Sequence, residues 1–226
     1  MIDFRLGRYQ DVLQDVVCDA VITDPPYSER VHKGHDYAVR PGRTLDSPRS
    51  ALSYDMWAED DVNEFVIFWK ERCKGWLVCL SDSEFCTVWR NAFDNNGYTA
   101  FHPVPALIPG MTVRLAGDGP SSWAIYANVA RPKSFYKWGT LPGGYYGKPD
   151  RGGHIGGKPL WLMNAIIRDY SKPGDLICDP CAGGATTLIA AASQDRRAVG
   201  SEMDEETYRK AKQRIEAGYT PDMYAA

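Results

Sequence analysis

The last third of the chain alternates short apolar runs with segments of helical periodicity, and this alternation constrains the fold more than any other feature. Strands are predicted at 176–178 and 198–200, and helices at 158–170, 185–192 and 205–217. Strands that are joined through helices run parallel, because each connection must cross over the sheet. The sequence therefore predicts an α/β fold with a doubly wound, mainly parallel sheet.

The first two thirds of the chain extend this pattern. Further strands are predicted at 2–6, 20–23, 76–80 and 122–129, with a strand region broken by prolines at 98–107. Further helices are predicted at 11–17, 60–72 and 83–95. Asp60 or Asp61 is expected to cap the helix 60–72, and Pro159 is expected in the first turn of the helix 158–170. The chain has 226 residues, no internal repeat and no clear linker. We therefore predict a single domain, 1–226.

Composition narrows the class of protein. Apolar residues make up 44% of the chain and charged residues 24%, as in soluble globular proteins. The formal net charge of −3 argues against a protein devoted to bulk nucleic-acid binding. Because the chain shows no amino-terminal targeting signal and no apolar run long enough to cross a bilayer, we expect a cytoplasmic protein without a membrane partner.

A stiff corner follows the strand 20–23. It consists of Asp24, Pro25, Pro26 and Tyr27. Proline cannot continue a sheet ladder and holds the preceding residue extended, so the backbone of this corner is fixed locally. Open α/β sheets bind ligands at the carboxyl ends of their strands. The corner is therefore a candidate site that offers a carboxylate, the Pro25 carbonyl and an aromatic ring; an ordinary surface turn is the alternative.

A second ligand-binding pattern lies between Asp175 and Thr187, where a strand, a glycine turn and a helix follow one another. Glycines let a ligand approach the backbone closely beside a helix amino end. The spacing differs from that of dinucleotide-binding turns, and no lysine supports a phosphate loop. Glu202 ends the next strand, where an acid can hold ribose hydroxyls. These features predict a nucleoside ligand such as S-adenosylmethionine.

The six cysteines predict no metal site. Cys178 and Cys181 form a C-x-x-C pair, but no second pair with ligand spacing accompanies it. His32 and His35 lie in a long polar segment without a ligand motif nearby. We interpret the cysteines as small buried side chains in a reducing compartment.

The two ligand-binding patterns together resemble the amino-methyltransferases that act on DNA, in the permuted motif order of the β class. Asp24-Pro25-Pro26-Tyr27 resembles the catalytic motif of that family, and residues 154–159 resemble its His-Pro-Thr-Gln-Lys-Pro segment. Residues 179–187 resemble its Asp-Pro-Phe-Ala-Gly-Ser-Gly-Thr cofactor motif, and Glu202 with Tyr208 resembles the ribose-binding acid and its helix. The resemblance covers nearly the whole chain and implies a circularly permuted, Rossmann-like methyltransferase fold.

The resemblance also assigns cofactor-binding residues, with some departures from the family pattern. Those for S-adenosylmethionine would be Asp24, Lys158, Asp179, Pro180, Cys181, Ala182, Gly183, Gly184, Thr186 and Glu202. Cys181 replaces the usual phenylalanine, Gly184-Ala185 replaces Ser-Gly, and residues 155–157 replace Pro-Thr-Gln. Gly7-Arg8 replaces Gly-Asp, which leaves Asp11 as the nearest acid to the expected adenine position. Altered cofactor contacts are expected from these changes.

The implied reaction is methyl transfer to an exocyclic amine of a flipped DNA base. Asp24, Pro25, Pro26 and Tyr27 would be catalytic: Asp24 and the Pro25 carbonyl accept the amine hydrogens, and Tyr27 stacks on the base. Aspartate before Pro-Pro-Tyr resembles the adenine-N6 members more than the cytosine-N4 members. The alternatives are a cytosine-N4 methyltransferase, an RNA or protein methyltransferase, and a catalytically weak DNA-binding subunit of a modification complex.

Two segments are predicted to face DNA, about 28–55 and 131–157. The stretch 131–158 holds six basic residues, one acid and five aromatic residues, a mixture that suits phosphates and stacked bases. The candidate DNA-binding residues are Arg30, Lys33, Arg40, Arg43, Lys133, Lys137, Lys148 and Arg151. So small a reading surface predicts a short site, loose specificity or a homodimer. The sequence leaves open whether a partner nuclease exists, as in restriction-modification.

Overall fold

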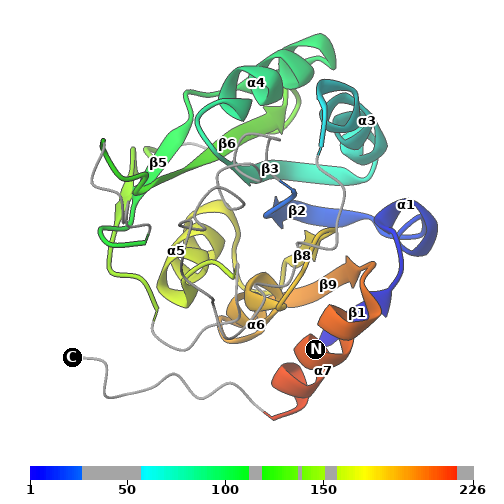
Figure 1. Cartoon of the computed structure of the whole chain (residues 1–226). Coiled ribbons are helices and arrows are strands. Elements are labelled where there is room, and N and C mark those ends of the chain that lie inside the picture. Colours follow the sequence, from blue (N-terminus) through cyan, green and yellow to red (C-terminus); the bar gives the residue numbers. More distant parts are fainter. Residues whose placement is uncertain (27–56, 112–118, 137–138, 151–156, 218–226) are drawn as a thin grey trace. The chain divides into compact units, whose positions relative to one another are not determined.

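The computed structural model describes residues 1–26, 57–111, 119–136, 139–150 and 157–217 (Figure 1). The chain divides into two compact units. The first comprises Met1–Asp24, Arg72–Val78 and the chain from Asp150 onward, and the second comprises Pro25–Glu71 and Cys79–Pro149. Each unit is therefore built from segments that are distant in sequence. That residues 1–226 act as a single domain stays a prediction.

The first unit is built on parallel strands. These are β1 (Ile2–Leu6), β2 (Cys18–Thr23), β8 (Leu176–Asp179) and β9 (Arg197–Glu202). They lie in the order β1-β9-β8-β2, and the next strand is β3 (Cys73–Ser81), which begins in this unit. All three adjacent pairs among the first four are parallel. Strand β2 is almost wholly buried, as expected for the β-branched and small residues of a central parallel strand.

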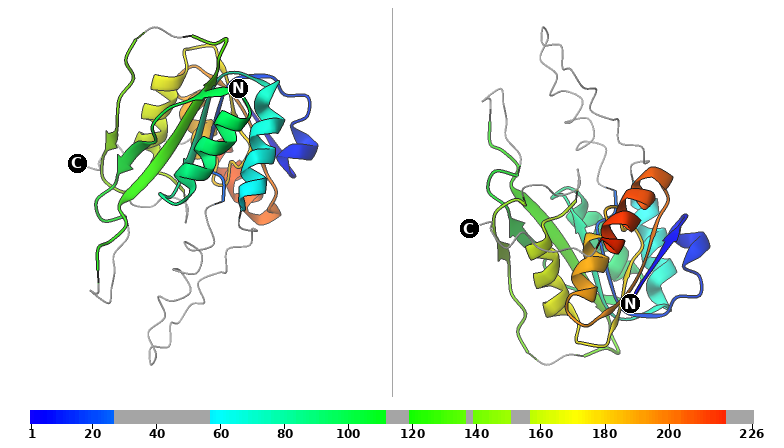
Figure 2. Two further views of the ribbon diagram at one scale, coloured as in Figure 1. Left: turned by 90° about the horizontal axis from the view of Figure 1, so that it is seen from above. Right: turned by 90° about the horizontal axis from the view of Figure 1, so that it is seen from below.

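Helices cover these strands. They are α1 (Tyr9–Val12), α5 (Leu160–Tyr170), α6 (Thr186–Ala192) and α7 (Glu205–Glu216). Helix α6 packs on β8 and β9 and lies beside α5, which contacts β2 (Figure 1). Helix α7 packs on β1 and β9, so elements from the two ends of the chain meet (Figure 2). The α/β class and the mainly parallel sheet are thus confirmed.

The chain leaves β8 and β2 in opposite directions across the sheet. From β8 it crosses through α6 to β9, whereas after β2 it continues to β3 on the other side. In open α/β sheets such a reversal opens a crevice at the carboxyl ends of the two strands, where ligands bind. Strand β8 ends at Asp179, and Asp24 directly follows β2. The fold therefore brings the two motifs found in the sequence to one edge of the sheet.

The second unit combines two helices with mostly antiparallel strands. Its elements are α3 (Glu59–Lys70), the end of β3, α4 (Phe85–Asn95), β4 (Tyr98–Ala100), β5 (Val104–Leu107), β6 (Ala124–Pro132) and β7 (Tyr145–Tyr146). Strands β4 and β5 pair antiparallel with β6, and β7 pairs parallel with β5. Its core is aromatic: Trp89 lies 5.6 Å from the rings of both Phe65 and Phe93, measured between ring centroids.

Several local predictions need correction. The predicted helix 11–17 is wrong in position, because α1 spans Tyr9–Val12 and the chain then turns. The strand region 98–107 is divided into two strands, as its prolines predicted, since Pro103 between them has no N–H for a ladder. Neither Asp60 nor Asp61 is the N-cap of α3: Ala58 holds that position, and its N–H donates to Asp61 Oδ2 at 2.7 Å. Pro159 is the N-cap of α5 and precedes its first turn.

Close packing of β8 against β9 makes Gly200 a test of the fold. A Cβ atom at Gly200 would lie 2.6 Å from the backbone oxygen of Asp179 and 3.0 Å from a methyl carbon of Leu188. Because that oxygen belongs to a paired strand, we expect Gly200→Ala to lower the free energy of unfolding by more than about 2 kcal/mol.

Urea unfolding followed by circular dichroism measures this loss. Gly143→Ala is the matched control, since a Cβ there meets no atom within 4 Å. The control should change stability by less than about 0.5 kcal/mol. Equal stabilities of the two variants would contradict the packing described for β8 and β9.

Candidate active site

Asp24 lies at the carboxyl end of β2 and its two carboxylate oxygens have different surroundings. Oδ2 accepts a short hydrogen bond from the ammonium group of Lys158, and the two side chains form an ion pair. The Asp24 side chain is 23% exposed and that of Lys158 is 12% exposed. Oδ1 is buried and has no hydrogen-bond partner among the residues that the structure describes. Asp24 therefore keeps one shielded acceptor atom for a donor from outside the protein.

The residues after Asp24 form the corner predicted from the sequence. The strand ends at Thr23, Pro25 is buried and Pro26 is partly buried. Tyr27, predicted to hold the base, lies outside the described residues, so its role stays a prediction. The backbone carbonyl of Pro25 is the second acceptor that the sequence places at this point.

Asp179 ends β8 and is 1% exposed. Its Oδ1 accepts hydrogen bonds from the Thr23 hydroxyl at 2.7 Å and from the Cys181 N–H at 3.2 Å. Burial raises the pKa of Asp179 from 3.8 to about 6; hydrogen bonds, chiefly from Thr187 and Thr23, oppose the rise, and the charge of Asp24 adds to it. The hydrogen bond from Thr23 to Asp179 therefore joins the ends of β2 and β8, although burying the Asp179 carboxylate costs free energy.

The turn from Pro180 to Ala185 is held from several sides. The Ser201 hydroxyl donates to the Pro180 carbonyl at 2.9 Å, and the Ala182 N–H donates to the Ser201 carbonyl at 2.9 Å. Gly183 and Ala185 are both left-handed, with φ of 48° and 61°. The turn therefore keeps its shape although alanine stands where the family pattern has glycine.

Glu202, at the end of β9, lies against the turn from Pro180 to Ala185, and we call this turn together with Glu202 the cradle. Its Oε2 accepts the Gly183 N–H at 3.0 Å and its Oε1 accepts the Asp204 N–H at 2.8 Å. Burial raises the pKa of Glu202, and these backbone donors oppose the rise. Each oxygen retains a lone pair, so Glu202 can still accept ribose hydroxyls.

Beside Glu202, the turn after β1 replaces the family's Gly-Asp. The Gly7 N–H donates to the Glu202 carbonyl at 2.9 Å, and Arg8 is the exposed N-cap of α1. The ring of Phe4 stacks on Tyr208 of α7 at 4.7 Å between centroids. Tyr208, which the sequence analysis paired with Glu202, thus anchors α7 to β1.

The charges of three carboxylates act on Cys181, whose side chain is partly buried. Burial raises the pKa of its thiol well above the ordinary value, and the charges of Asp179, Glu202 and Asp24 raise it further. The thiol therefore stays protonated at neutral pH and is a poor metal ligand or nucleophile. Within the described residues no cluster of His, Cys, Asp or Glu could hold a metal ion.

The site as a whole is acidic: three carboxylates lie around Cys181, and the Lys158 ammonium is paired with one of them. A sulfonium ion beside these groups would be attracted, and the glycine turn exposes backbone to a ligand. The residues present therefore fit the S-adenosylmethionine expected from the sequence. Lys158, assigned to the cofactor in the sequence analysis, is found on the Asp24 carboxylate.

The candidate DNA-binding residues are only partly described. Arg30, Lys33, Arg40, Arg43, Lys137 and Arg151 lie outside the described residues. Lys133 directly follows β6. Lys148 follows β7, which lies near the start of β6, because Leu107 of β5 pairs with both Ala124 of β6 and Tyr146 of β7. The nine residues of β6 span about 30 Å, so these two lysines do not form one patch.

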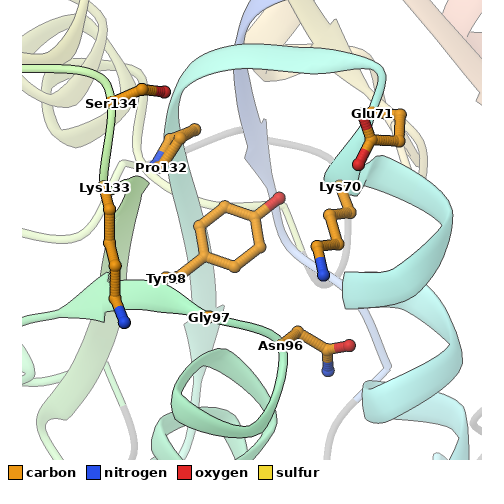
Figure 3. A pocket seen from close by; sticks show the side chains of 8 residues that line it. All are labelled: Lys70, Glu71, Asn96, Gly97, Tyr98, Pro132, Lys133 and Ser134. Atoms are coloured by element: carbon orange, nitrogen blue, oxygen red, sulfur yellow. The ribbon is translucent and has the colours of Figure 1, made fainter.

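Lys133 lines a pocket of about 210 Å³ in the second unit (Figure 3). Lys70 and Lys133 stand on two sides of Tyr98 there (Figure 3). The other lining residues are Glu71, Asn96, Gly97, Pro132 and Ser134. The pocket is smaller than the roughly 300–1,000 Å³ of typical ligand sites and contains no residue of the two sequence motifs. It is not the cofactor site.

Sequence reasoning missed several contacts of the site. Thr23 was treated as part of a strand, yet its hydroxyl bonds to Asp179. Asp150 accepts the Leu160 N–H at 2.6 Å and so supplies the cap that Pro159 does not give to α5. The Arg214 guanidinium donates to the Gly184 carbonyl at 2.6 Å and to the Thr186 hydroxyl at 3.0 Å. No local sequence pattern predicts these contacts, because the two partners of each contact lie far apart in sequence.

The sheet order and the turn after β8 are those of a Rossmann-like methyltransferase fold, and the chain is similar to known proteins of that fold. Residues 121–213 match the model of a family described as DNA methylase, which covers both N6 and N4 enzymes. The chain is therefore similar to this DNA methylase family over residues 121–213.

Individual relatives support this assignment. The chain is 26% identical over 207 residues to the candidate methylase YubD of Escherichia coli (strain K12), covering 88% of this chain and 82% of that protein. It is 38% identical over 66 residues to the type II methyltransferase M.HindIII of Haemophilus influenzae, covering 29% of this chain and 21% of that enzyme.

Solved structures share the fold. A complex of M1.HpyAVI with S-adenosylmethionine aligns with a TM-score of 0.72 and 19% identity, over 95% of this chain and 99% of that one. The cytosine-N4-specific PvuII DNA methyltransferase aligns with a TM-score of 0.65 and 13% identity, over 100% and 96%. No helix in the described part of the chain is long and apolar enough to cross a membrane.

The raised pKa of Asp179 predicts a pH-dependent stability. Since its pKa is about 6 in the folded protein against 3.8 ordinarily, its contribution to stability is fully present below pH 3.8 and is lost as the pH rises through 6. Asparagine has no such titration. Relative to Asp179→Asn, the wild type should lose about 2 kcal/mol between about pH 4.5 and about pH 7.5.

Urea unfolding of both proteins at the two pH values measures this difference. Any constant effect of the amide cancels in the comparison. Asp175→Asn, directly before β8, serves as the control and should track the wild type. A stability difference between wild type and Asp179→Asn that does not vary with pH would contradict the assignment.

Proposed function

We propose that this protein transfers a methyl group from S-adenosylmethionine to the exocyclic N6 amine of an adenine flipped out of DNA. The observation that carries the proposal is the buried Oδ1 of Asp24, which has no hydrogen-bond partner in the part of the chain that the structure describes. It lies at the end of β2, next to the glycine turn that follows β8. An acceptor held in place beside a cofactor cradle is what an amine nucleophile requires.

In this proposal the cradle binds the cofactor through groups already held in place. Glu202 accepts hydrogen bonds from the ribose hydroxyls, and the turn 180–184 lies against the nucleoside. Asp179 and Glu202 favour the positive charge of the sulfonium, whereas the charge of Asp24 is paired with Lys158. The complex of M1.HpyAVI with S-adenosylmethionine, which has the same fold, supports this choice of cofactor.

Catalysis rests on positioning. The lone pair of an exocyclic amine is delocalised into the base, so the nitrogen is a poor nucleophile. Asp24 Oδ1 and the Pro25 carbonyl each accept one amine hydrogen and draw the nitrogen toward tetrahedral geometry. The bound cofactor supplies an electrophilic methyl group: a nitrogen–carbon bond forms, the carbon–sulfur bond breaks, and its electron pair stays on sulfur. Asp24 accepts the proton that the nitrogen then loses.

The base must leave the duplex to reach Asp24, which costs a few kcal/mol. Stacking on an aromatic ring offsets about 1–3 kcal/mol of this cost. We assign this role to Tyr27, directly after the proline corner. Residues 1–226 would form one catalytic domain, and the segments 28–55 and 131–157 would contact DNA.

Adenine is proposed over cytosine because aspartate precedes Pro-Pro-Tyr. The second candidate is cytosine-N4 methylation, which the likeness to the PvuII enzyme favours. Incubating the protein with methyl-labelled S-adenosylmethionine and PCR-amplified bacterial DNA, which carries no methylation, tests both. Mass spectrometry of the nucleosides should find labelled N6-methyldeoxyadenosine. Labelled N4-methyldeoxycytidine would establish the second candidate, and unlabelled DNA would overturn the proposed activity.

Asp24→Ala removes the amine acceptor. We expect the methylation rate to fall by at least about 1,000-fold, since loss of one oxyanion-hole-type group costs a comparable factor. Cofactor affinity, measured by calorimetry, should change less than about threefold, because Asp24 acts on the base. Asp94→Ala, at an exposed position of α4, is the control and should retain full activity. An active Asp24→Ala enzyme would exclude the assigned role.

Glu202→Ala tests the cofactor site. We expect the dissociation constant for S-adenosylmethionine to rise by at least about tenfold, the effect of losing one or two hydrogen bonds to a carboxylate. Some stability should also be lost, because the N–H groups of Gly183 and Asp204 lose their acceptor. Glu205→Ala, exposed in the first turn of α7, is the control. Unchanged affinity in the folded Glu202→Ala protein would count against ribose binding there.

A further inference from the structure

We propose that Lys158 is a positioning residue for methyl transfer: it holds the Asp24 carboxylate so that Oδ1 faces the incoming amine. This inference rests on the proposed function and adds a residue to it. The geometry that carries it is asymmetric. One oxygen of Asp24 is bound to the Lys158 ammonium, and the other is buried without a partner among the described residues.

A free carboxylate rotates about its bond to Cβ and presents its oxygens in turn. An ion pair at one oxygen stops this rotation, and the partner used here is well suited to the task. Lysine is a donor only, so it cannot compete with Asp24 for the hydrogens of an amine. Because the Lys158 side chain is 12% exposed, little water competes for Asp24 Oδ2.

The charge of Lys158 matters as much as its hydrogen bond. Asp24 shares the site with Asp179 and Glu202, and the charge of Asp24 acts on the buried Asp179. Repulsion among three carboxylates would drive the Asp24 side chain out toward water. The ammonium opposes this repulsion and keeps the carboxylate inside the site.

The backbone that follows Lys158 is anchored at two points. Pro159 is the N-cap of α5, which fixes φ one residue later. The Asp150 carboxylate accepts the Leu160 N–H at 2.6 Å and holds the helix start. The ammonium is therefore delivered from a rigid helix end, as expected for a group that must position another.

A different role for Lys158 is an ion pair with the carboxylate of the cofactor's methionine part. The two roles predict different kinetics. A cofactor ligand contributes to ground-state binding, and its loss raises the cofactor KM and Kd. A positioning residue acts on the reacting amine, and its loss lowers kcat at saturating cofactor while the cofactor Kd stays nearly unchanged.

The test uses the full chain, PCR-amplified bacterial DNA and methyl-labelled S-adenosylmethionine. Lys158→Met keeps the length of the side chain but not its charge, and we expect kcat to fall about 100-fold, as for a misplaced reacting group. The Kd of S-adenosylmethionine, measured by calorimetry, should stay within about threefold of the wild type. Lys158→Arg should restore kcat to within about tenfold, since it keeps both charge and donors.

Two further variants make the result decisive. Lys158→Gln keeps a hydrogen-bond donor but loses the charge. Its kcat should lie between those of Lys158→Met and Lys158→Arg. It replaces Lys158→Met in the test if the Lys158→Met protein does not fold. Lys210→Met breaks an exposed lysine–carboxylate pair with Glu206 and should match the wild type.

The outcomes separate the inference from the proposed function. If wild-type protein labels no DNA, the proposed function fails. If the wild type is active and Lys158→Met, or Lys158→Gln in its place, keeps its kcat, the positioning role is overturned. A cofactor Kd raised more than about tenfold with kcat intact would assign Lys158 to the cofactor instead.

Discussion

The parallel pairing of β2 with β8 is the constraint on which the site depends. Its register places Ala20 beside Ile177 and Val21 beside Cys178, so the two strands end at the same edge. The Thr23 hydroxyl then bonds to Asp179 Oδ1 at 2.7 Å, between two residues that are almost wholly buried. Because side chains alternate along a strand, a slip of one residue would turn Thr23 and Asp24 to the wrong faces. The proline corner and the glycine turn meet only in this register.

The parts of the site that were predicted from the sequence are local in the chain. Prolines after β2 stop the strand at Asp24, and glycines after β8 mark a turn that a ligand can approach. Both signals depend on neighbouring residues alone, which is why the class of fold and the motif positions could be predicted. The metal-free interpretation of Cys178 and Cys181 also used the sequence alone, because a zinc site needs a second ligand pair that the sequence lacks; it stays a prediction.

The parts that could not be predicted join distant residues. Lys158 and Asp24 are 134 positions apart, and Thr23 and Asp179 are 156 apart. Their contacts follow from packing, which no local pattern encodes. The reverse also occurs: Lys133 and Lys148 are close in sequence, yet β6 separates them, since one follows its end and the other lies beside its start. Closeness in sequence therefore does not give closeness in the fold, which only the strand pairing provides.

The site holds an electrostatic arrangement that is unfavourable for folding and suited to binding. Burial raises the pKa values of Asp179 and Glu202, so at neutral pH the folded protein keeps carboxylates where they are poorly solvated. Ala185, held at φ 61°, adds backbone strain of about 1 kcal/mol in the same turn. A cationic ligand reduces the repulsion among the carboxylates, which gives it a free-energy gain that a neutral ligand of the same shape lacks. After methyl transfer the sulfur is neutral and that gain is lost. The acids that destabilise the cradle without a ligand thus favour binding of the methyl donor, whose sulfur is positively charged, over the product, whose sulfur is neutral.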